Sequence, residues 1–426
     1  MRGARLIRRI AASVGHRAHR TKLVAERAWI GMENARTRHH GASDLLILDD
    51  CFPNVLSAFR MAEFTAYLQD FPTAQVHSTG SALSQYSTLP ESIRRFHRAH
   101  PEWAGRVRRF HPQRRLNGTL AYLVFLMNAH FYIETLEQRA LPFVFTLYPG
   151  GYFHLNDPVS DGKLKRVLSS PMFRKVIVTQ RITQDYLLQK GWCAPDQIEY
   201  VFGVVTPSDR LAAVGPPRKY GVNKETIDLC FVAHKYMPRG IDKGYDRFIE
   251  TACALSRRHP QARFHVVGPF DESDIDVRDI RDRVTFHGTQ PTEFFPDFYA
   301  GMDIILSPNA PFILAAGAFD GFPTGCCVEA GLCGVAVFCC DELRQNDGHF
   351  RDGEEIVLIP RDAAGICCAI ERYLADPNRL ARLARDGQRA FQRVYDLDRQ
   401  MAPRLNVLRS LSGKGAERVG ELCRTV

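Results

Sequence analysis

Short apolar runs alternate with segments of helical periodicity along most of this chain. The runs cover residues 44–50, 121–127, 141–148, 176–179 and 198–205, and then 227–233, 262–267, 284–286, 303–307, 335–339 and 356–359. Near-continuous apolar runs of this kind are typical of strands buried on both faces of a parallel sheet. Helices between such strands imply right-handed crossovers. The pattern therefore predicts an α/β fold built from parallel sheets.

The two series of runs are separated by residues 206–224. This segment contains Pro207, Gly215, Pro216 and Pro217 and has little apolar periodicity, so it is typical of a linker. A chain of 426 residues is also too long for one ordinary core. We therefore expect two Rossmann-like, doubly wound domains. The expected parts are an arm (1–43), a first domain (44–205), the linker (206–224), a second domain (225–400) and a C-terminal helical tail (401–426).

Within the first domain, residues 72–118 are rich in Ser, His and Arg and lack periodicity, so they are expected to form an insertion. A helix is expected after the first run, with Phe59, Ala62 and Ala66 on one face. Further helices are expected at about 130–139 and 184–190. Residues of about 362–412 read as a long helical segment that packs on the second domain and crosses back.

Composition places the chain among ordinary globular proteins, with 45% hydrophobic and 24% charged residues. No apolar run reaches about 18 residues, so no membrane-spanning helix is expected. The N-terminus lacks the apolar core of a secretory signal. The twelve cysteines include three adjacent pairs and no CxxC spacing, so they indicate buried thiols in a reducing cytoplasm rather than metal ligands or disulfides.

The net charge of +9 is concentrated in the arm. Residues 1–43 contain ten Lys or Arg and two Glu, while the remaining body is close to neutral. Leu6, Ile7, Ile10 and Val14 recur at helical spacing among arginines, as in an amphipathic helix that lies on an anionic membrane surface. An unstructured basic tail, or a start codon assigned too far upstream, explains the same residues. Nucleic acid is not expected as a partner, since no nucleic-acid fold follows the arm.

The junction from Phe319 to Gly334, FDGFPTGCCVEAGLCG, joins a polar, glycine-rich loop to a small-residue helix. Pro323 suits the first helical position and Thr324 can cap, so the helix is expected to start at 323 or 324. Free backbone N–H groups around Gly325 and the positive end of the helix would cradle a phosphate. Glu329, one to two turns in, could accept hydrogen bonds from a sugar hydroxyl. In an ordinary buried junction the acids would only cap the helix.

This stretch resembles the acidic signature of retaining GT-B glycosyltransferases, especially family 4. In that family a first carboxylate contacts the donor sugar and a second binds the nucleotide ribose, with seven residues between two Glu. Here eight residues separate Asp320 from Glu329. The resemblance implies two Rossmann-like domains facing across a cleft. It spans roughly residues 44–410 and is strongest over 227–360.

The same resemblance points to the loop after the run 227–233. Family members carry an Arg there and, several residues on, a Lys before Gly, and both cations neutralise the donor diphosphate. Lys243 and Gly244 match the second element, while Lys235 and Arg239 are the candidates for the first. Fixed cations lower the barrier because the leaving diphosphate gains negative charge. The alternative is a solvated lysine at a helix start.

In the first domain, the run 141–148 ends in a loop that contains Gly150, Gly151 and His154. Doubly wound sheets place ligands at this edge, and the resemblance implies an acceptor-side loop here. Arg60, in the helix after the first run, could reach a phosphate or the acceptor. A surface ion pair between Arg60 and Glu63 at i,i+3 explains it equally well.

The sequence thus predicts a glycosyltransferase of the hexosyltransferase class, in the cytoplasm or peripheral on the inner face of the membrane. The resemblance implies that it moves a sugar from a nucleoside diphosphate sugar to a hydroxyl of a glycan or lipid-linked acceptor, with retention and without metal or cofactor. Lys243, Asp320, Glu329 and His154 are the expected catalytic residues. The alternatives are a catalytically silent binding module, or another GT-B enzyme such as a sugar phosphorylase or nucleotide-sugar epimerase. No Walker loop, zinc pattern or Ser-His-Asp order is present in the sequence.

Overall fold

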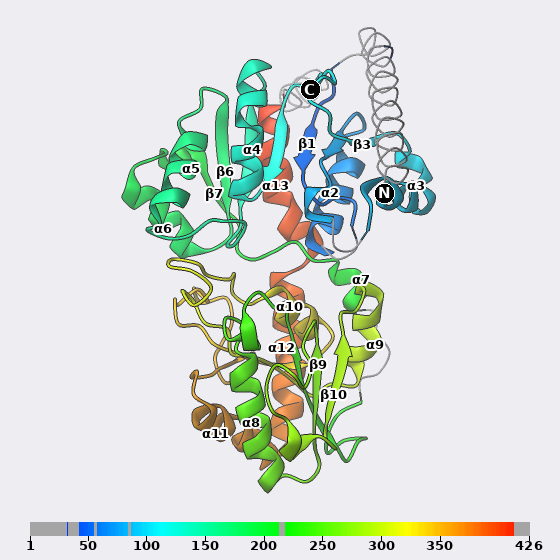
Figure 1. The fold of residues 1–426 in the computed structure, drawn as a ribbon, viewed down its shortest axis with the longest axis vertical. Coiled ribbons are helices and arrows are strands. Elements are labelled where there is room, and N and C mark those ends of the chain that lie inside the picture. The colour runs from blue at the N-terminus through cyan, green and yellow to red at the C-terminus, as the bar shows by residue number, and fades with distance from the viewer. Residues whose placement is uncertain (1–31, 33–41, 55–57, 84–86, 213–217, 413–426) are drawn as a thin grey trace, which may run out of the picture.

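The computed structural model describes residue 32 and residues 42–54, 58–83, 87–212 and 218–412. The basic arm therefore lies almost wholly outside the described residues, and its predicted membrane helix is not part of this description. Figure 1 shows the two domains one above the other, with the N-terminal half of the chain in the upper domain. No helix within the described ranges is long and apolar enough to cross a membrane.

The first domain is built on a seven-stranded, wholly parallel sheet of order β3-β2-β1-β4-β5-β6-β7. Its strands are β1 (Leu46–Asp49), β2 (Gln75–Ser78), β3 (Val107–Arg109), β4 (Ala121–Val124), β5 (Phe143–Leu147), β6 (Phe173–Val178) and β7 (Ile198–Tyr200). The register between β1 and β4 places Leu46 opposite Ala121. The apolar runs of the sequence thus predicted five of the seven strands.

The remaining two strands correct the expectation for residues 72–118. That segment is not an insertion, because it contributes β2, β3 and the intervening helix α3 to the sheet and its cover. The strands escaped prediction because their sequences, QVHS and VRR, are short and polar. His77 and Ser78 are nevertheless buried, since β2 lies between β1 and β3.

Helices cover both faces of this sheet, as doubly wound folds require. They are α2 (Ala58–Asp70), α3 (Leu89–Ala99), α4 (Leu126–Gln138), α5 (Pro158–Leu168) and α6 (Arg181–Lys190). The short helix α7 (Ser208–Ala212) follows this sheet and packs on the second domain, where Leu211 belongs to a buried cluster. Helix α5 begins with Pro158 in its first turn, and the Asp157 side chain accepts a hydrogen bond from Ser160 N–H. Helix α6 ends at Gly191, which adopts the left-handed conformation.

The second domain contains a six-stranded parallel sheet of order β10-β9-β8-β11-β12-β13. Its strands are β8 (Ile227–Val232), β9 (Ala262–Val267), β10 (Val284–Gly288), β11 (Ile304–Ser307), β12 (Ala336–Cys339) and β13 (Val357–Leu358). Every apolar run predicted after residue 224 is therefore a strand. Its helices are α8 (Tyr245–Arg258), α9 (Phe295–Ala300), α10 (Gly325–Leu332), α11 (Ala363–Leu374) and α12 (Pro377–Val394).

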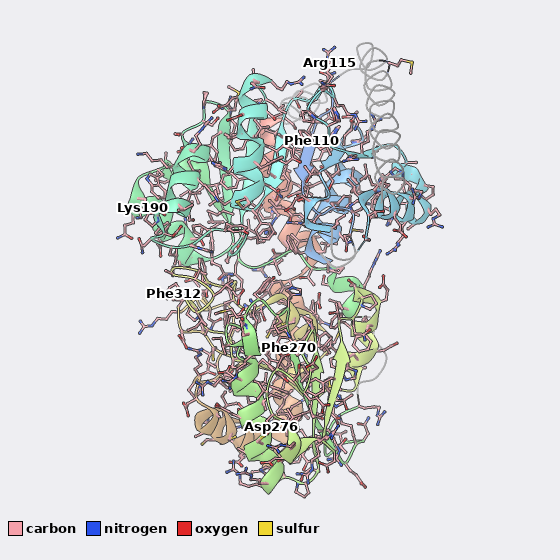
Figure 2. All side chains as sticks on the ribbon, in the orientation of Figure 1. Phe110, Arg115, Lys190, Phe270, Asp276 and Phe312 are labelled. Carbon is pink, nitrogen blue, oxygen red and sulfur yellow. The ribbon has the colours of Figure 1, made fainter. Side chains whose placement is uncertain are left out.

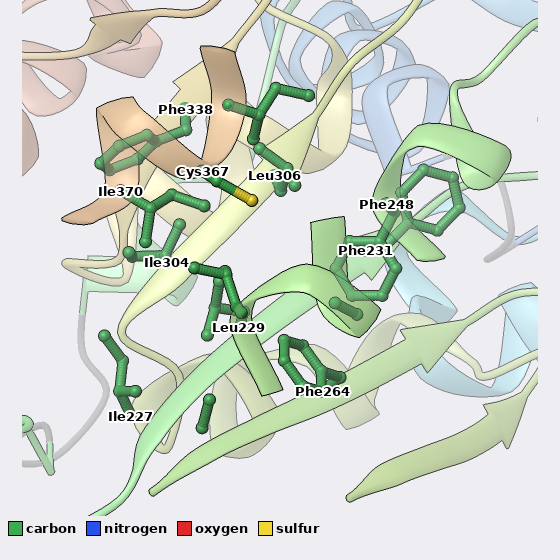
Figure 3. Close-up of a cluster of buried hydrophobic side chains, with 14 of the residues drawn as sticks. Ile227, Leu229, Phe231, Phe248, Phe264, Ile304, Leu306, Phe338, Cys367 and Ile370 are labelled. Carbon is green, nitrogen blue, oxygen red and sulfur yellow. The ribbon is translucent and has the colours of Figure 1, made fainter. Parts of the chain in front are cut away.

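The apolar runs of the second domain form its buried core. Leu229 and Phe231 of β8, Phe264 of β9 and Ile304 of β11 pack against helices α8 and α11 (Figure 3). Cys367 lies in the same cluster, as expected for a small buried thiol. These close-packed strands fix where the loops at their carboxyl ends stand.

The last helix of the described residues, α13 (Leu397–Leu411), returns to the first domain. In Figure 1 it is the red helix within the upper domain, while α12 lies in the lower one. Met401, Val407 and Leu408 belong to the buried cluster of the first domain, and Arg409 pairs with Asp70 of α2. The predicted crossing back is thus present in the structure.

Candidate functional site

A cleft of about 1380 Å³, open to solvent, lies between the two domains. Ala58, Phe59 and residues 204–206 line it from the first domain, and loops at the carboxyl ends of β8, β9, β10 and β11 line it from the second. Parallel sheets place their ligands at this edge. The junction that carries Asp320 and Glu329 is part of the wall.

The start of α10 opens into the cleft. Thr324 occupies the N-cap position with an extended backbone, and Gly325 is the first helical residue. The Thr324 side chain does not cap the helix, because its hydroxyl lies 3.3 Å from Ser307 Oγ and 3.2 Å from Cys326 Sγ. A Cβ on Gly325 would meet no atom within 4 Å, so space remains in front of the first turn. The helix starts slightly later than predicted, and Pro323 precedes it.

Lys243 and Asp320 form an ion pair in the wall of the cleft. Lys243 Nζ donates to both carboxylate oxygens of Asp320 at 2.7 Å. Burial would lower the pKa of Lys243, but the charge and hydrogen bonds of Asp320 outweigh it, so the pKa lies above its usual value. Asn309 Nδ2 also donates to Asp320 at 2.7 Å, and Asn309 accepts from Ser307 Oγ at 2.7 Å. Both acidic oxygens of Asp320 are therefore occupied by this chain's own donors.

Glu329 also lines the cleft, one turn into α10. Its carboxylate has no hydrogen-bond partner among the described residues, although the residue is half-buried. Burial raises the pKa of Glu329 to about 7, because no cation or donor offsets the loss of water. A ligand hydroxyl would supply the missing donor.

The other two predicted cations lie elsewhere. Lys235 donates to both oxygens of Asp274 at 2.9 Å, and its ammonium lies 5.8 Å from the ring centre of Phe270, which is labelled in Figure 2. Arg239 is exposed and does not line the cleft. Among the described lysines and arginines, Lys243 alone lines it. The donor-binding role expected of Lys235 and Arg239 is therefore not supported by their positions.

Gly244, which follows Lys243, allows two loops to approach closely. Its φ is +76°, and a Cβ there would fall 2.2 Å from the carbonyl oxygen of Pro308. Any side chain would push the loop after β8 away from the loop after β11. Gly244 thus holds Lys243 next to Asn309 and Asp320.

In the first domain, the expectation for Arg60 is corrected. Arg60 is buried, with Nη1 3.0 Å from Asp50 and Nε 3.5 Å from Asp49, and it does not line the cleft. The predicted ion pair between Arg60 and Glu63 is wrong. Glu63 is fully buried, and its nearest cation is Arg404. The spacing of residues along α2 could not reveal that Asp49, at the end of β1, and Asp50 after it would pair with Arg60.

The loop with Gly150, Gly151 and His154 is packed against the second domain instead of lining the cleft. Leu155 N–H donates to Gly317 O at 2.9 Å, and the rings of Phe153 and Phe319 are 5.7 Å apart. His154 is half-buried and its backbone N–H donates to Ser160 Oγ. The loop therefore supports the segment before Asp320, which also carries Phe312 (Figure 2).

Sequence reasoning missed several polar residues of the cleft, among them Asn309, His234 and Gln290. His234 and Asn309 each come two residues after the last residue of a strand, β8 and β11, and Gln290 comes two residues after β10. Their common signal is thus a polar side chain just beyond the carboxyl end of a parallel strand.

Comparisons with known proteins agree with this architecture. Residues 247–406 match the protein family described as glycosyl transferase-like. A comparison with curated protein sequences found no match.

Three solved structures with this fold illustrate the similarity. A glycosyltransferase from Rickettsia africae has a TM-score of 0.60 at 12% identity, over 88% of this chain and 99% of that one. Anabaena HepE in complex with UDP has a TM-score of 0.55 at 16% identity, over 88% and 99%. Sucrose-phosphate synthase from Thermosynechococcus elongatus has a TM-score of 0.54 at 16% identity, over 90% and 100%. This chain therefore has the GT-B fold, and its residues 247–406 match the family model described as glycosyl transferase-like.

Proposed function

We propose that this protein is a glycosyltransferase that moves a hexosyl group from a nucleoside diphosphate sugar to a hydroxyl acceptor. The observation that carries the proposal is the convergence of Lys243, Asp320, Glu329 and the first turn of α10 on one cleft between the domains. A cation, a helix N-terminus and two carboxylates match the parts of such a donor: diphosphate, ribose and sugar. The HepE structures with UDP and UDP-glucose support a uridine nucleotide as the first donor to test.

In the proposed complex, Lys243 turns from Asp320 to the diphosphate, which also accepts from the backbone N–H groups at the start of α10. Asp320 then has an oxygen free for a sugar hydroxyl, while Asn309 keeps the carboxylate in place. Glu329 accepts from the ribose. The Lys243–Asp320 pair thus avoids an unpaired, half-buried charge before the donor arrives.

The proposed transfer breaks the bond between the sugar's anomeric carbon and the phosphate oxygen. The electron pair goes to the diphosphate, where Lys243 and the helix amides stabilise the growing charge. The acceptor oxygen bonds to the anomeric carbon from the same face, and its proton passes to the leaving phosphate. This retaining course needs no protein nucleophile, and the family resemblance of the α10 junction supports it.

The deciding experiment incubates the protein with a panel of nucleotide sugars and simple glycoside acceptors. The proposal predicts free nucleoside diphosphate together with a new glycoside of unchanged anomeric configuration, seen by NMR. A silent binding module would bind nucleotide without turnover. A phosphorylase would require inorganic phosphate, and an epimerase would change the sugar without an acceptor.

The Asp320→Asn variant tests the sugar contact. We expect turnover to fall about tenfold, because a neutral amide replaces a charge-assisted hydrogen bond to the sugar. The affinity for UDP alone should be unchanged or higher, since Lys243 no longer has a competing anion. Steady-state kinetics and calorimetry separate the two effects. Full turnover in this variant would exclude Asp320 from the sugar site.

The Glu329→Gln variant tests the ribose contact through its pH dependence. The ribose hydroxyls bind the ionised carboxylate, so wild-type affinity for UDP should fall as the pH drops through the Glu329 pKa of about 7. About a tenth of the groups remain ionised one pH unit below a pKa, so the fall between pH 8 and pH 6 is up to about tenfold. The variant lacks this titration, while protonation of the UDP phosphate affects both proteins. Parallel pH profiles of the two proteins would contradict the assignment.

A further inference from the structure

A second space between the two domains lies beside α2. This groove, about 1320 Å³ and open to solvent, runs between α2, His100 and Trp103 of the first domain and α7 and α9 of the second. Figure 1 shows α2, α7 and α9 on the same side of the molecule, with α7 and α9 at the boundary of the two domains. None of the residues in the donor-binding proposal lines it.

Helix α2 presents an uncharged face to the groove. The groove-lining residues of α2 follow helical spacing: Ala58, Met61, Ala62, Thr65, Ala66 and Gln69. The opposite face of α2 is already buried in the first domain, with Phe64, Tyr67 and Leu68 in its core. A helix that is buried on one face and has no charged residue on the opposite face is usually covered on both of them. Along α2 this face is about 17 Å long, at 1.5 Å per residue.

The remaining walls are also mainly apolar. Trp103 contributes its ring from the first domain, where it stacks on His100 at a centroid distance of 4.8 Å. Leu211 and Pro296 contribute from the second domain. The described lining contains one Arg, Arg210, and one acid, Glu293, so their charges cancel. Such a lining suits an uncharged apolar chain rather than a polyanion.

The groove adjoins the donor cleft. Ala58 and Thr292 line both spaces, one from each domain. A molecule whose hydroxyl end reaches the cleft can therefore extend its other end along α2. The reacting end of an acceptor must lie in the cleft. Because the groove adjoins that cleft, the groove is better placed for the rest of a substrate than for a separate partner.

We propose that this groove binds the aliphatic tail of an amphiphilic acceptor, whose hydroxyl-bearing head lies in the donor cleft. The assignment rests on the proposed glycosyl transfer and names its acceptor class. Burial of each methylene contributes favourable transfer from water, so affinity should depend on tail length until the groove is filled.

The test uses hexyl, octyl and decyl β-glucosides below micellar concentrations, with binding followed by calorimetry. In the wild-type protein we expect Kd to fall up to about fourfold for each added methylene. Ala62→Glu places a charge on the groove floor and should abolish this dependence while leaving UDP affinity unchanged. Thr65→Glu, one turn along, is the second variant, since the Thr65 hydroxyl bonds only backbone of its own helix. Ala364→Glu on the exposed face of α11 is the matched control and should keep the wild-type dependence.

The outcomes separate this proposal from the one on which it rests. A wild-type Kd that is independent of tail length, or equal dependence in Ala62→Glu, overturns the tail site. Self-association of the wild type that Ala62→Glu abolishes, without alkyl binding, assigns the groove to a second copy and also overturns it. Tail-dependent binding without any UDP binding or turnover keeps the groove and contradicts the glycosyltransferase.

Discussion

Replacing Lys243 with Ala should weaken UDP binding about ten- to a hundredfold without unfolding the protein. Lys243 is the one cation that the described residues bring to the cleft, and only 13% of its side chain is exposed. A hydrogen bond to a charged group is worth roughly 1.5–3 kcal/mol, which gives this range. Calorimetry with UDP measures the change, and thermal melting checks the fold.

Two further variants make this result specific. Lys235→Ala removes a lysine from the same loop, but one that pairs with Asp274 outside the cleft, so UDP affinity should change less than about twofold. Lys243→Ala also leaves Asp320 unpaired opposite the phosphates. Combining it with Asp320→Asn removes that repulsion and should recover part of the loss. Equal effects of Lys235→Ala and Lys243→Ala would contradict the site.

Replacing Arg404 with Leu should destabilise the protein by about 3–5 kcal/mol, because it leaves Glu63 buried without its cation. Both side chains are fully buried, with Arg404 Nε 3.9 Å from Glu63 Oε1. Glu63 also accepts from the hydroxyls of Tyr67 and Tyr148, each at 3.1 Å. Glu63→Gln combined with Arg404→Met should be less destabilised than Arg404→Leu alone, since neither buried charge remains.

Thermal melting provides the measurement, and we expect a fall in Tm of roughly 10 °C. Arg409→Ala is the control on the same helix, where a half-exposed arginine pairs with Asp70. Exposed pairs contribute about 0–1 kcal/mol, so its effect should be small. Similar melting of the two variants would show that the Glu63 pair adds no more than a surface contact.

The sequence predicted the fold well where the chain makes buried strands from apolar residues. Each strand of the second domain coincides with a predicted apolar run. The strands in the middle of this sheet are buried on both of its faces, so nearly all of their residues must be apolar. Strands β2 and β3 were missed because they are short and polar, and the sheet alone gives them their place.

The candidate site was predictable only in part, and for a similar reason. The α10 junction and Lys243 have local signatures, since a loop, a glycine and a helix start are neighbours in sequence. The pairing of Lys243 with Asp320, 77 residues later, depends on two strand ends that meet in space. Arg60 shows the converse, since its neighbour Glu63 suggested one partner, while Asp49 at the end of β1 and Asp50 after it are the partners in the structure.

The return of α13 to the first domain has a consequence for synthesis. Arg404, Met401 and Leu408 complete a core whose first strand begins at Leu46, so the earliest and the last described segments are needed together. The second sheet is assembled from residues that lie wholly between them. During translation the second domain can therefore finish its core first, although its residues emerge later. Until α13 arrives, the first domain leaves apolar surface and the carboxylate of Glu63 uncovered.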